Sequence, residues 1–250
     1  MGMMNPPEIP FPEKTMRLYI IRHAEPDYEH NTITPQGHKE AKALAKRLKG
    51  EGLTRIYSSP LGRALHTAQY TAKATGLKIK VEPWTRELSD LKMGLVPPWG
   101  PLMAWDLPGE IIRRRREHLT HDRWHKIPLF GQKKFRAEIT RVHHHSDTFL
   151  KRHGYQRVGG RYRVLKANRE RIAVFCHGGL GITWLAHLLE IPLPLIWTGF
   201  WMAPSSFATL LFDMRSEKWA VPRCIGFCDV SHLHLEGLPV STHGIKANFD

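Results

Sequence analysis

The sequence predicts an α/β protein, a three-layer sandwich in which a mostly parallel central sheet is covered by helices on both faces. Short apolar runs rich in β-branched and aromatic residues alternate with stretches of helical periodicity along the chain. One run, "RIAVFC" (171–176), is almost continuously apolar, which is typical of a strand buried on both faces. At 250 residues the chain is long enough for one large core.

The first predicted strand is "MRLYII" (16–21), and a helix follows it. Thr34 is suited to the N-cap of this helix and Pro35 to its first position, and apolar residues recur along one face of 36–48. Gly50 supplies a stop signal.

The same alternation continues on both sides of a long middle segment. We expect strands at 55–59 and 79–83, with a helix from Pro60 to about Ala74 that stops at Gly76. Towards the C-terminus the sequence predicts the 171–176 strand, a helix over 179–190, and further strands over 205–214 and 223–230.

Between these regions, residues 91–168 lose the alternating pattern. This segment combines scattered prolines, three tryptophans (Trp99, Trp105, Trp124) and the run "RRRR" at 113–116. It leaves the third strand near the edge where ligands bind in open α/β sheets, so we interpret it as an insertion over a site. Residues 1–15 read as a loose, Pro-rich arm, and 16–250 as a single domain.

The overall composition narrows the class of ligand. Lysine and arginine number 37 against 23 acidic residues, a formal charge of +14, so phosphate esters, nucleic acid or acidic lipid would be attracted.

Three cysteines (Cys176, Cys224, Cys228) suit a reducing compartment, and we expect a cytoplasmic protein. Polar residues and prolines interrupt the most apolar region, so no membrane span is expected. A homodimer is compatible with the sequence.

Three predicted strands end in reactive polar groups. Arg22 and His23 follow the first strand, Arg63 lies in the first turn after the second, and His177 follows 171–176. The carboxyl ends of parallel strands meet at one edge, where arginine forks, Gly178 and the following helix N-terminus would form a phosphate pocket. An unprotonated histidine in such a pocket can attack phosphorus, so we interpret His23 as the nucleophile of a phosphohistidine intermediate.

These motifs resemble the histidine phosphatase superfamily, the phosphoglycerate mutase-like proteins. The stretches that carry the resemblance are "RHAEP", "LTRIYSSPLGRALHTA", "TRELSD" and "VFCHGG". The resemblance implies a phosphoglycerate mutase-like domain that transfers phosphoryl groups without a metal or organic cofactor. It also implies that Arg63 binds phosphate, that Glu87 is the proton donor, and that His177 is the second histidine. Asp90, three residues after Glu87, is an alternative donor.

The function that follows is a metal-independent phosphomonoesterase that hydrolyses a small phosphorylated metabolite. A phosphomutase would use the same phosphohistidine and pass the phosphoryl group to a second substrate hydroxyl instead of water. A non-catalytic phosphate-recognition or adaptor module is a further alternative, which the presence of both histidines and Glu87 disfavours.

Other motifs are interpreted as structural. The tract His143-His144-His145 projects in three directions on a helix, so we do not expect it to chelate a metal. The arginine run with its tryptophans could bind single-stranded nucleic acid, but we favour a solvated basic face over a substrate pocket. Cys176 should point away from the site, and Cys224 and Cys228 should be buried thiols.

Overall fold

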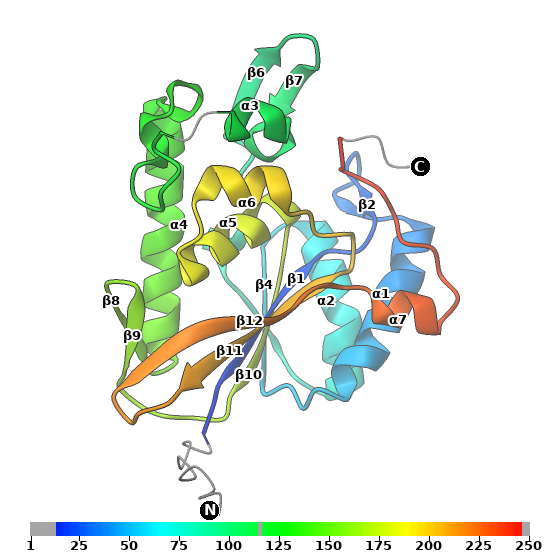
Figure 1. The fold of residues 1–250 in the computed structure, drawn as a ribbon. Coiled ribbons are helices and arrows are strands. Elements are labelled where there is room, and N and C mark those ends of the chain that lie inside the picture. The colour runs from blue at the N-terminus through cyan, green and yellow to red at the C-terminus, as the bar shows by residue number, and fades with distance from the viewer. Residues whose placement is uncertain (1–13, 115–116, 247–250) are drawn as a thin grey trace, which may run out of the picture.

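The structure is a computed structural model that describes residues 14–114 and 117–246. Its centre is an eight-stranded sheet in the order β5-β4-β10-β1-β11-β12-β9-β8 (Figure 1). The predicted α/β sandwich is confirmed. The predicted loose arm, residues 1–15, lies almost wholly outside the described residues.

One half of the sheet is parallel and the other is antiparallel. The parallel half contains β5 (Ile79–Val81), β4 (Arg55–Ser58), β10 (Arg171–Cys176) and β1 (Arg17–Arg22). The antiparallel half contains β11 (Phe207–Met214), β12 (Trp219–Asp229), β9 (Arg161–Val164) and β8 (Tyr155–Val158). The sheet is thus mixed where a mostly parallel one was predicted, because short turns join β11 to β12 and β8 to β9, and such turns impose antiparallel pairing.

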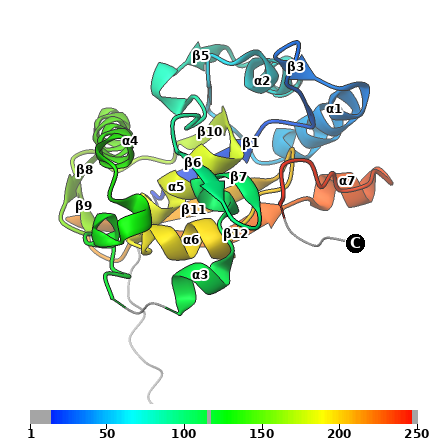
Figure 2. The ribbon, with the colours of Figure 1, turned by 90° about the horizontal axis from the view of Figure 1, so that it is seen from above.

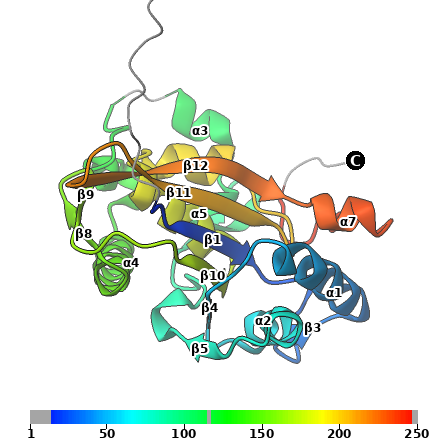
Figure 3. The same ribbon diagram turned by 90° about the horizontal axis from the view of Figure 1, so that it is seen from below.

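Alternation along β1 divides the core between the two faces of the sheet. Leu18 and Ile20 belong to the larger apolar cluster, while Tyr19 and Ile21 belong to a second one. The larger cluster is covered by α4 (Lys133–Arg152), α5 (Gly178–Leu189) and α6 (Leu193–Gly199). The second is covered by α1 (Pro35–Lys49) and α2 (Gly62–Thr75), with α7 (Ser231–Leu235) beside α1 (Figure 3).

Local signals in the sequence explain the ends of these helices. The Thr34 hydroxyl accepts a hydrogen bond from the Gly37 N–H at 3.0 Å, as the N-cap of α1, with Pro35 following. Gly76 ends α2 in the left-handed region, at φ 73°, where glycine has no steric penalty.

The segment predicted as an insertion, 91–168, is partly integral to the core. Its first part holds the hairpin β6 (Lys92–Val96) and β7 (Gly100–Met103), then α3 (Gly109–Arg113) and short 3-10 turns. Residues 92–114 lie above α5 and α6, and residues 117–130 lie beside the upper end of α4; we call the two ranges together the cover (Figures 1 and 2). From Lys133 onward, α4 packs on the sheet and β9 pairs with β12, so the expected insertion extended too far.

Two small strands, β2 (Pro26–Asp27) and β3 (Thr32–Ile33), follow β1 and lie beside α2. The 3-10 turn Pro83–Thr85 links β5 to the cover. Among the described residues, no helix is both long enough and apolar enough to cross a membrane.

Candidate active site

His23 stands at the carboxyl end of β1 and is 1% exposed. Its Nδ1 lies 2.7 Å from the Ala24 carbonyl oxygen. A carbonyl only accepts, so the hydrogen-bond network assigns the proton to Nδ1 and leaves a lone pair on Nε2. Arg63 Nε donates to this Nε2 at 3.3 Å. Burial, together with the charge of Arg22, lowers the pKa of His23 well below its usual value, so the ring is neutral.

His177 follows β10 and is fully buried beside His23, with the two ring centroids 5.1 Å apart. Its Nε2 lies 2.7 Å from the Ser59 hydroxyl oxygen, whereas its Nδ1 has no hydrogen-bond partner among the described residues. Burial and the neighbouring His23 lower the pKa of His177 well below its usual value. The unpartnered Nδ1 is therefore a group that a ligand could satisfy.

Arg22 is held from two sides. Its Nη1 donates to the Met202 carbonyl at 2.5 Å and its Nη2 to the His243 carbonyl at 2.9 Å. Its buried Nε has no partner among the described residues and lies close to Gly178, where an added Cβ would come within 3.4 Å of it. Two hydrogen bonds thus orient the fork, and the buried Nε–H is among the donors that remain for an anion.

Arg63 lies in the first turn of α2, above the ring of Tyr28 at 5.2 Å. Its Nη1 donates to the Asn31 side-chain oxygen at 3.3 Å. The close approach of this loop explains Gly62, because a Cβ there would meet the Asn31 carbonyl oxygen at 2.1 Å.

Glu87 lies at the N-terminus of α5. Its carboxylate accepts hydrogen bonds from the N–H groups of Leu180 at 2.9 Å, Leu88 at 3.0 Å and Gly179 at 3.3 Å. Burial raises the pKa of Glu87, and these backbone donors oppose the rise. Asp90 is exposed and is not among the residues that line the main cavity.

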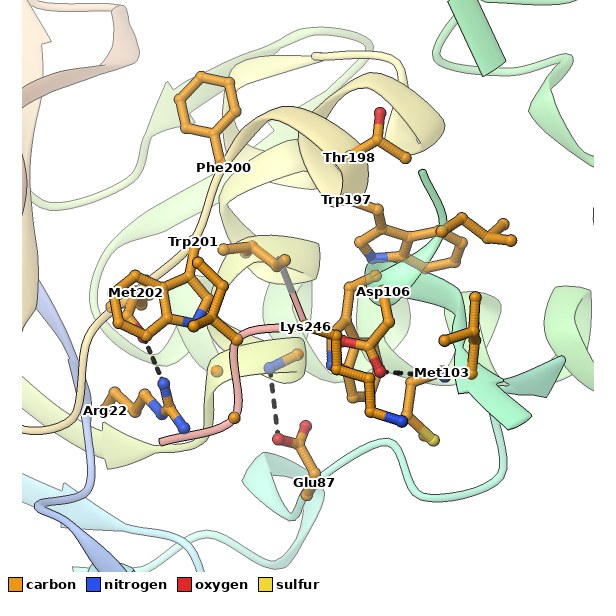
Figure 4. Close-up of a pocket in the computed structure, with 18 of the residues that line it drawn as sticks. Arg22, Glu87, Met103, Asp106, Trp197, Thr198, Phe200, Trp201, Met202 and Lys246 are labelled. Carbon is orange, nitrogen blue, oxygen red and sulfur yellow. Dashed lines mark hydrogen bonds between the residues drawn. The ribbon is translucent and has the colours of Figure 1, made fainter. Parts of the chain in front are cut away.

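These groups form the floor of a cavity of about 970 Å³. Arg22, Arg63, Glu87 and Gly178 line it, whereas His23 and His177 are too buried to contribute. Aromatic side chains contribute to the walls. The cover supplies Trp99 and Trp105. Trp197 of α6, and Phe200 and Trp201 of the chain that follows α6, supply the others (Figure 4). The C-terminal segment, residues 236–246, contributes Gly244, Ile245 and Lys246 to the lining of the cavity.

The structure therefore brings together every residue that the sequence predicted for the site. Sequence reasoning missed Ser59, Asn31 and the C-terminal segment. The sequence "SSP" at the end of β4 offered a signal for Ser59, because it places a polar residue at the same sheet edge as the predicted site. Asn31 has φ 50°, a backbone conformation that asparagine adopts more readily than most residues. The C-terminal segment carries no comparable signal.

The other predicted motifs are distributed differently. Trp124 is buried in the core, so it cannot stack on a nucleic-acid base, and Arg115 and Arg116 lie outside the described residues. Cys176 is buried, and burial raises its pKa, so it is an inert thiol. Cys224 and Cys228 are free and only partly buried.

Comparison with known proteins adds a second line of argument. The sequence model of the histidine phosphatase superfamily (branch 1) matches residues 18–100. A probable phosphoglycerate mutase GpmB from Photorhabdus laumondii is 34% identical over 82 residues, covering 29% of this chain and 38% of that protein. A GpmB from Escherichia fergusonii is 34% identical over 83 residues, or 30% and 39%. The match thus spans about two fifths of these relatives' length.

Solved structures match over more of the chain. A phosphoserine phosphatase mutant from Entamoeba histolytica, in complex with phosphoserine, has a TM-score of 0.57 at 19% identity, covering 87% of this chain and 99% of that one. YhfR from Bacillus stearothermophilus has a TM-score of 0.56 at 21% identity, with the same coverage. A mycobacterial glucosyl-3-phosphoglycerate phosphatase has a TM-score of 0.54 at 20% identity, covering 86% and 99%. These proteins share the fold.

Proposed function

We propose that this chain is a phosphomonoesterase of the histidine phosphatase superfamily, and that it hydrolyses a small phosphorylated metabolite. The observation that carries the proposal is the unprotonated Nε2 of His23, oriented by the Ala24 carbonyl and contacted by Arg63 Nε, beside a cavity that Arg22, Arg63 and Glu87 line. A neutral imidazole beside a phosphate-binding fork is the arrangement that nucleophilic attack on phosphorus requires.

In the proposed reaction, His23 Nε2 forms a bond to phosphorus while the bond from phosphorus to the ester oxygen breaks. Glu87 gives its proton to that leaving oxygen. Water then attacks the phosphohistidine, Glu87 takes a proton from the water, and inorganic phosphate leaves with His23 restored. Arg22, Arg63, His177 and the Gly178 N–H stabilise the charge on the transferring oxygens.

Phosphate binding requires one rearrangement. Arg63 Nε now donates to His23 Nε2, so it must turn away to free the lone pair for phosphorus. The phosphate oxygens offer it a stronger, charged acceptor. The aromatic walls of the cavity favour a substrate that carries an apolar or ring-bearing group beside its phosphate.

The first prediction tests the chemistry. Purified protein should hydrolyse p-nitrophenyl phosphate at 25 °C in EDTA, because the proposed transfer uses no metal. Quenching without acid should trap an acid-labile, base-stable phosphoryl group on His23. His23→Ala should lose both label and turnover, whereas the exposed His234→Ala should keep them.

Three other outcomes would redirect the proposal. Label that persists in His23→Ala would move the nucleophile elsewhere. Transfer of label to a hydroxyl compound in preference to water would identify a mutase, the activity named for the GpmB relatives. Phosphate binding without label or turnover in the wild type would support a recognition module.

A further inference from the structure

Three histidines from three different segments meet on the α4 side of the sheet. His121 comes from the cover, His143 from α4 and His187 from the last turn of α5. One ring nitrogen of each lies within 4.8 Å of the others. The rings of His143 and His187 stack at 3.9 Å, and His121 lies 5.9 Å from His143. His187 follows His177 by ten helical residues, roughly 15 Å along α5, so this cluster is separate from the active site.

Two of these nitrogens are buried without a hydrogen-bond partner among the described residues. His187 is 3% exposed, and its Nε2 lies 2.9 Å from the Asp147 carboxylate. The carboxylate accepts the Nε2 proton, which leaves a lone pair on the unpartnered Nδ1. His121 Nε2 is buried and unpartnered as well. Buried polar atoms are rarely left unsatisfied, so these two nitrogens are available to a ligand.

The charges around the cluster are compatible with a cation. Burial lowers the pKa of His143 to about 3 and also lowers those of His121 and His187, so the rings are unprotonated. Arg157 opposes a cation, but Glu190 pairs with it at 2.8 Å. Asp147 and Asp122 add negative charge.

We propose that His121, His143 and His187 bind a divalent transition metal, Zn²⁺ in the first place, with Asp147 orienting His187. Neutral imidazoles are preferred ligands of Zn²⁺, and a carboxylate on the far nitrogen of a ligating histidine is a common supporting contact. Tetrahedral Zn²⁺ needs nitrogens roughly 3.3 Å apart, so the rings must draw together from their present separation of up to 4.8 Å.

The proposal revises the interpretation of the histidine tract. His144 is exposed and His145 stacks on Trp84 at 6.4 Å, so the three consecutive residues do not chelate together, as the helix geometry predicts. His143 instead finds its partners on distant segments. A metal there would tie the cover to α4 and α5, and so stabilise the structure that encloses the cavity.

The experiment uses the untagged full chain, stripped with EDTA and then titrated with Zn²⁺ by calorimetry and with Co²⁺ by absorption. We expect one equivalent to bind, with the visible bands of low-coordinate Co²⁺. Zn²⁺ at 100 times its Kd should raise the Tm by roughly 5–10 °C. His143→Gln and His121→Gln should each lose the bands and the rise in Tm, and His144→Gln should keep both.

Circular dichroism of the unloaded variants, and their turnover of p-nitrophenyl phosphate, report whether each one folds. Absence of stoichiometric binding in the wild type would overturn the proposal. Binding that persists in His143→Gln, or that His144→Gln abolishes, would also overturn it. The phosphohistidine experiment measures label on His23, at the other end of α5 from the three histidines. The proposed phosphatase activity and the proposed metal site can therefore fail independently.

Discussion

At the scale of single residues, Glu87 is the group whose role depends most on its surroundings. Two of the three N–H groups that contact its carboxylate belong to the first turn of α5, the helix end that would otherwise face a phosphate. They stabilise the ionised form, while burial stabilises the protonated form that a proton donor needs. The geometry thus suits a group that gives a proton and takes one back.

The second prediction follows from this setting. Glu87→Gln keeps an acceptor for the backbone donors but cannot give up a proton, so phosphoenzyme formation from alkyl phosphates should fall by roughly 100-fold to 10,000-fold. p-Nitrophenyl phosphate should be spared, since nitrophenolate leaves as an anion. The control is the exposed Asp90→Asn, measured by rapid quench on both substrates. A leaving-group dependence that appeared in Asp90→Asn alone would reassign the donor.

Glu40 supplies the third prediction. It is fully buried on α1, it accepts the Glu25 N–H at 2.9 Å, and burial raises its pKa to about 7. In the unfolded chain it titrates near 4.5. Folding is therefore opposed by ionisation of this group progressively from about pH 4.5 upward, and fully above about pH 7.

Glu40→Gln retains the acceptor without the charge. The substitution should change the free energy of unfolding in the stabilising direction, and this gain should be about 2–3 kcal/mol larger at pH 8 than at pH 4.5. Thermal unfolding of both proteins at the two pH values measures this difference. An equal effect of the substitution at pH 4.5 and pH 8 would show that Glu40 does not titrate in this range.

At the scale of elements, the C-terminal segment is the part of the site that is hardest to predict from the sequence. The His243 carbonyl holds Arg22, the His243 ring lies 5.3 Å from that of Tyr28, and Lys246 Nζ donates to the Pro101 carbonyl at 3.0 Å. These contacts are made by backbone groups and by residues far apart in the chain, and neither leaves a periodic pattern in a sequence.

The fourth prediction concerns this segment. A chain that ends at Val240 loses the hydrogen bond that the charged Arg22 Nη2 donates to the His243 carbonyl, and such a bond is worth about 1.5–3 kcal/mol. Its kcat/KM for p-nitrophenyl phosphate should fall roughly 10-fold to 100-fold. Lys246→Ala, which leaves the His243 carbonyl in place, should have a smaller effect. Unchanged kinetics in the shortened chain would mean that Met202 alone orients Arg22.

The elements that the sequence predicts well are those with local signals. The N-cap at Thr34 and the stop at Gly76 define α1 and α2, and β1 and β10 are apolar runs that end in charged or polar groups. The residues of β9 were assigned to an insertion instead. They pair with β12, which lies more than fifty residues later in the chain. Neither stretch contains a local sequence pattern that identifies the other as its partner.

The predicted site could be assembled from sequence for a similar reason. Each motif ends a strand of the parallel half, so topology alone brings Arg22, Arg63 and His177 to one edge. The metal cluster could not be predicted in this way. His121 lies in the cover, and its approach to α4 and α5 depends on tertiary packing.

At the scale of the whole molecule, the formal charge of +14 needs a separate account from the site. The two arginines of the cavity floor are a small part of the 37 basic residues. The remaining charge acts at long range, where it raises the concentration of any anion near the surface, and salt screens it. Trp124, one of the three tryptophans of the alternative nucleic-acid surface, is buried in the core.

The fifth prediction separates this long-range attraction from the local contacts. If the net charge steers a dianionic substrate to the cavity, kcat/KM for p-nitrophenyl phosphate should fall by about 10-fold or more between 0.01 M and 0.5 M ionic strength. Over this range the Debye length shrinks from about 30 Å to only a few Å. The kcat should change little, because Arg22 and Arg63 act on the bound phosphate at contact distance and are partly shielded from salt by burial.

Short single-stranded DNA at 0.15 M salt should not compete, since binding through phosphate contacts alone weakens steeply with salt. Strong competition at that salt concentration, together with a flat kcat/KM, would point to a nucleic-acid surface in place of substrate steering.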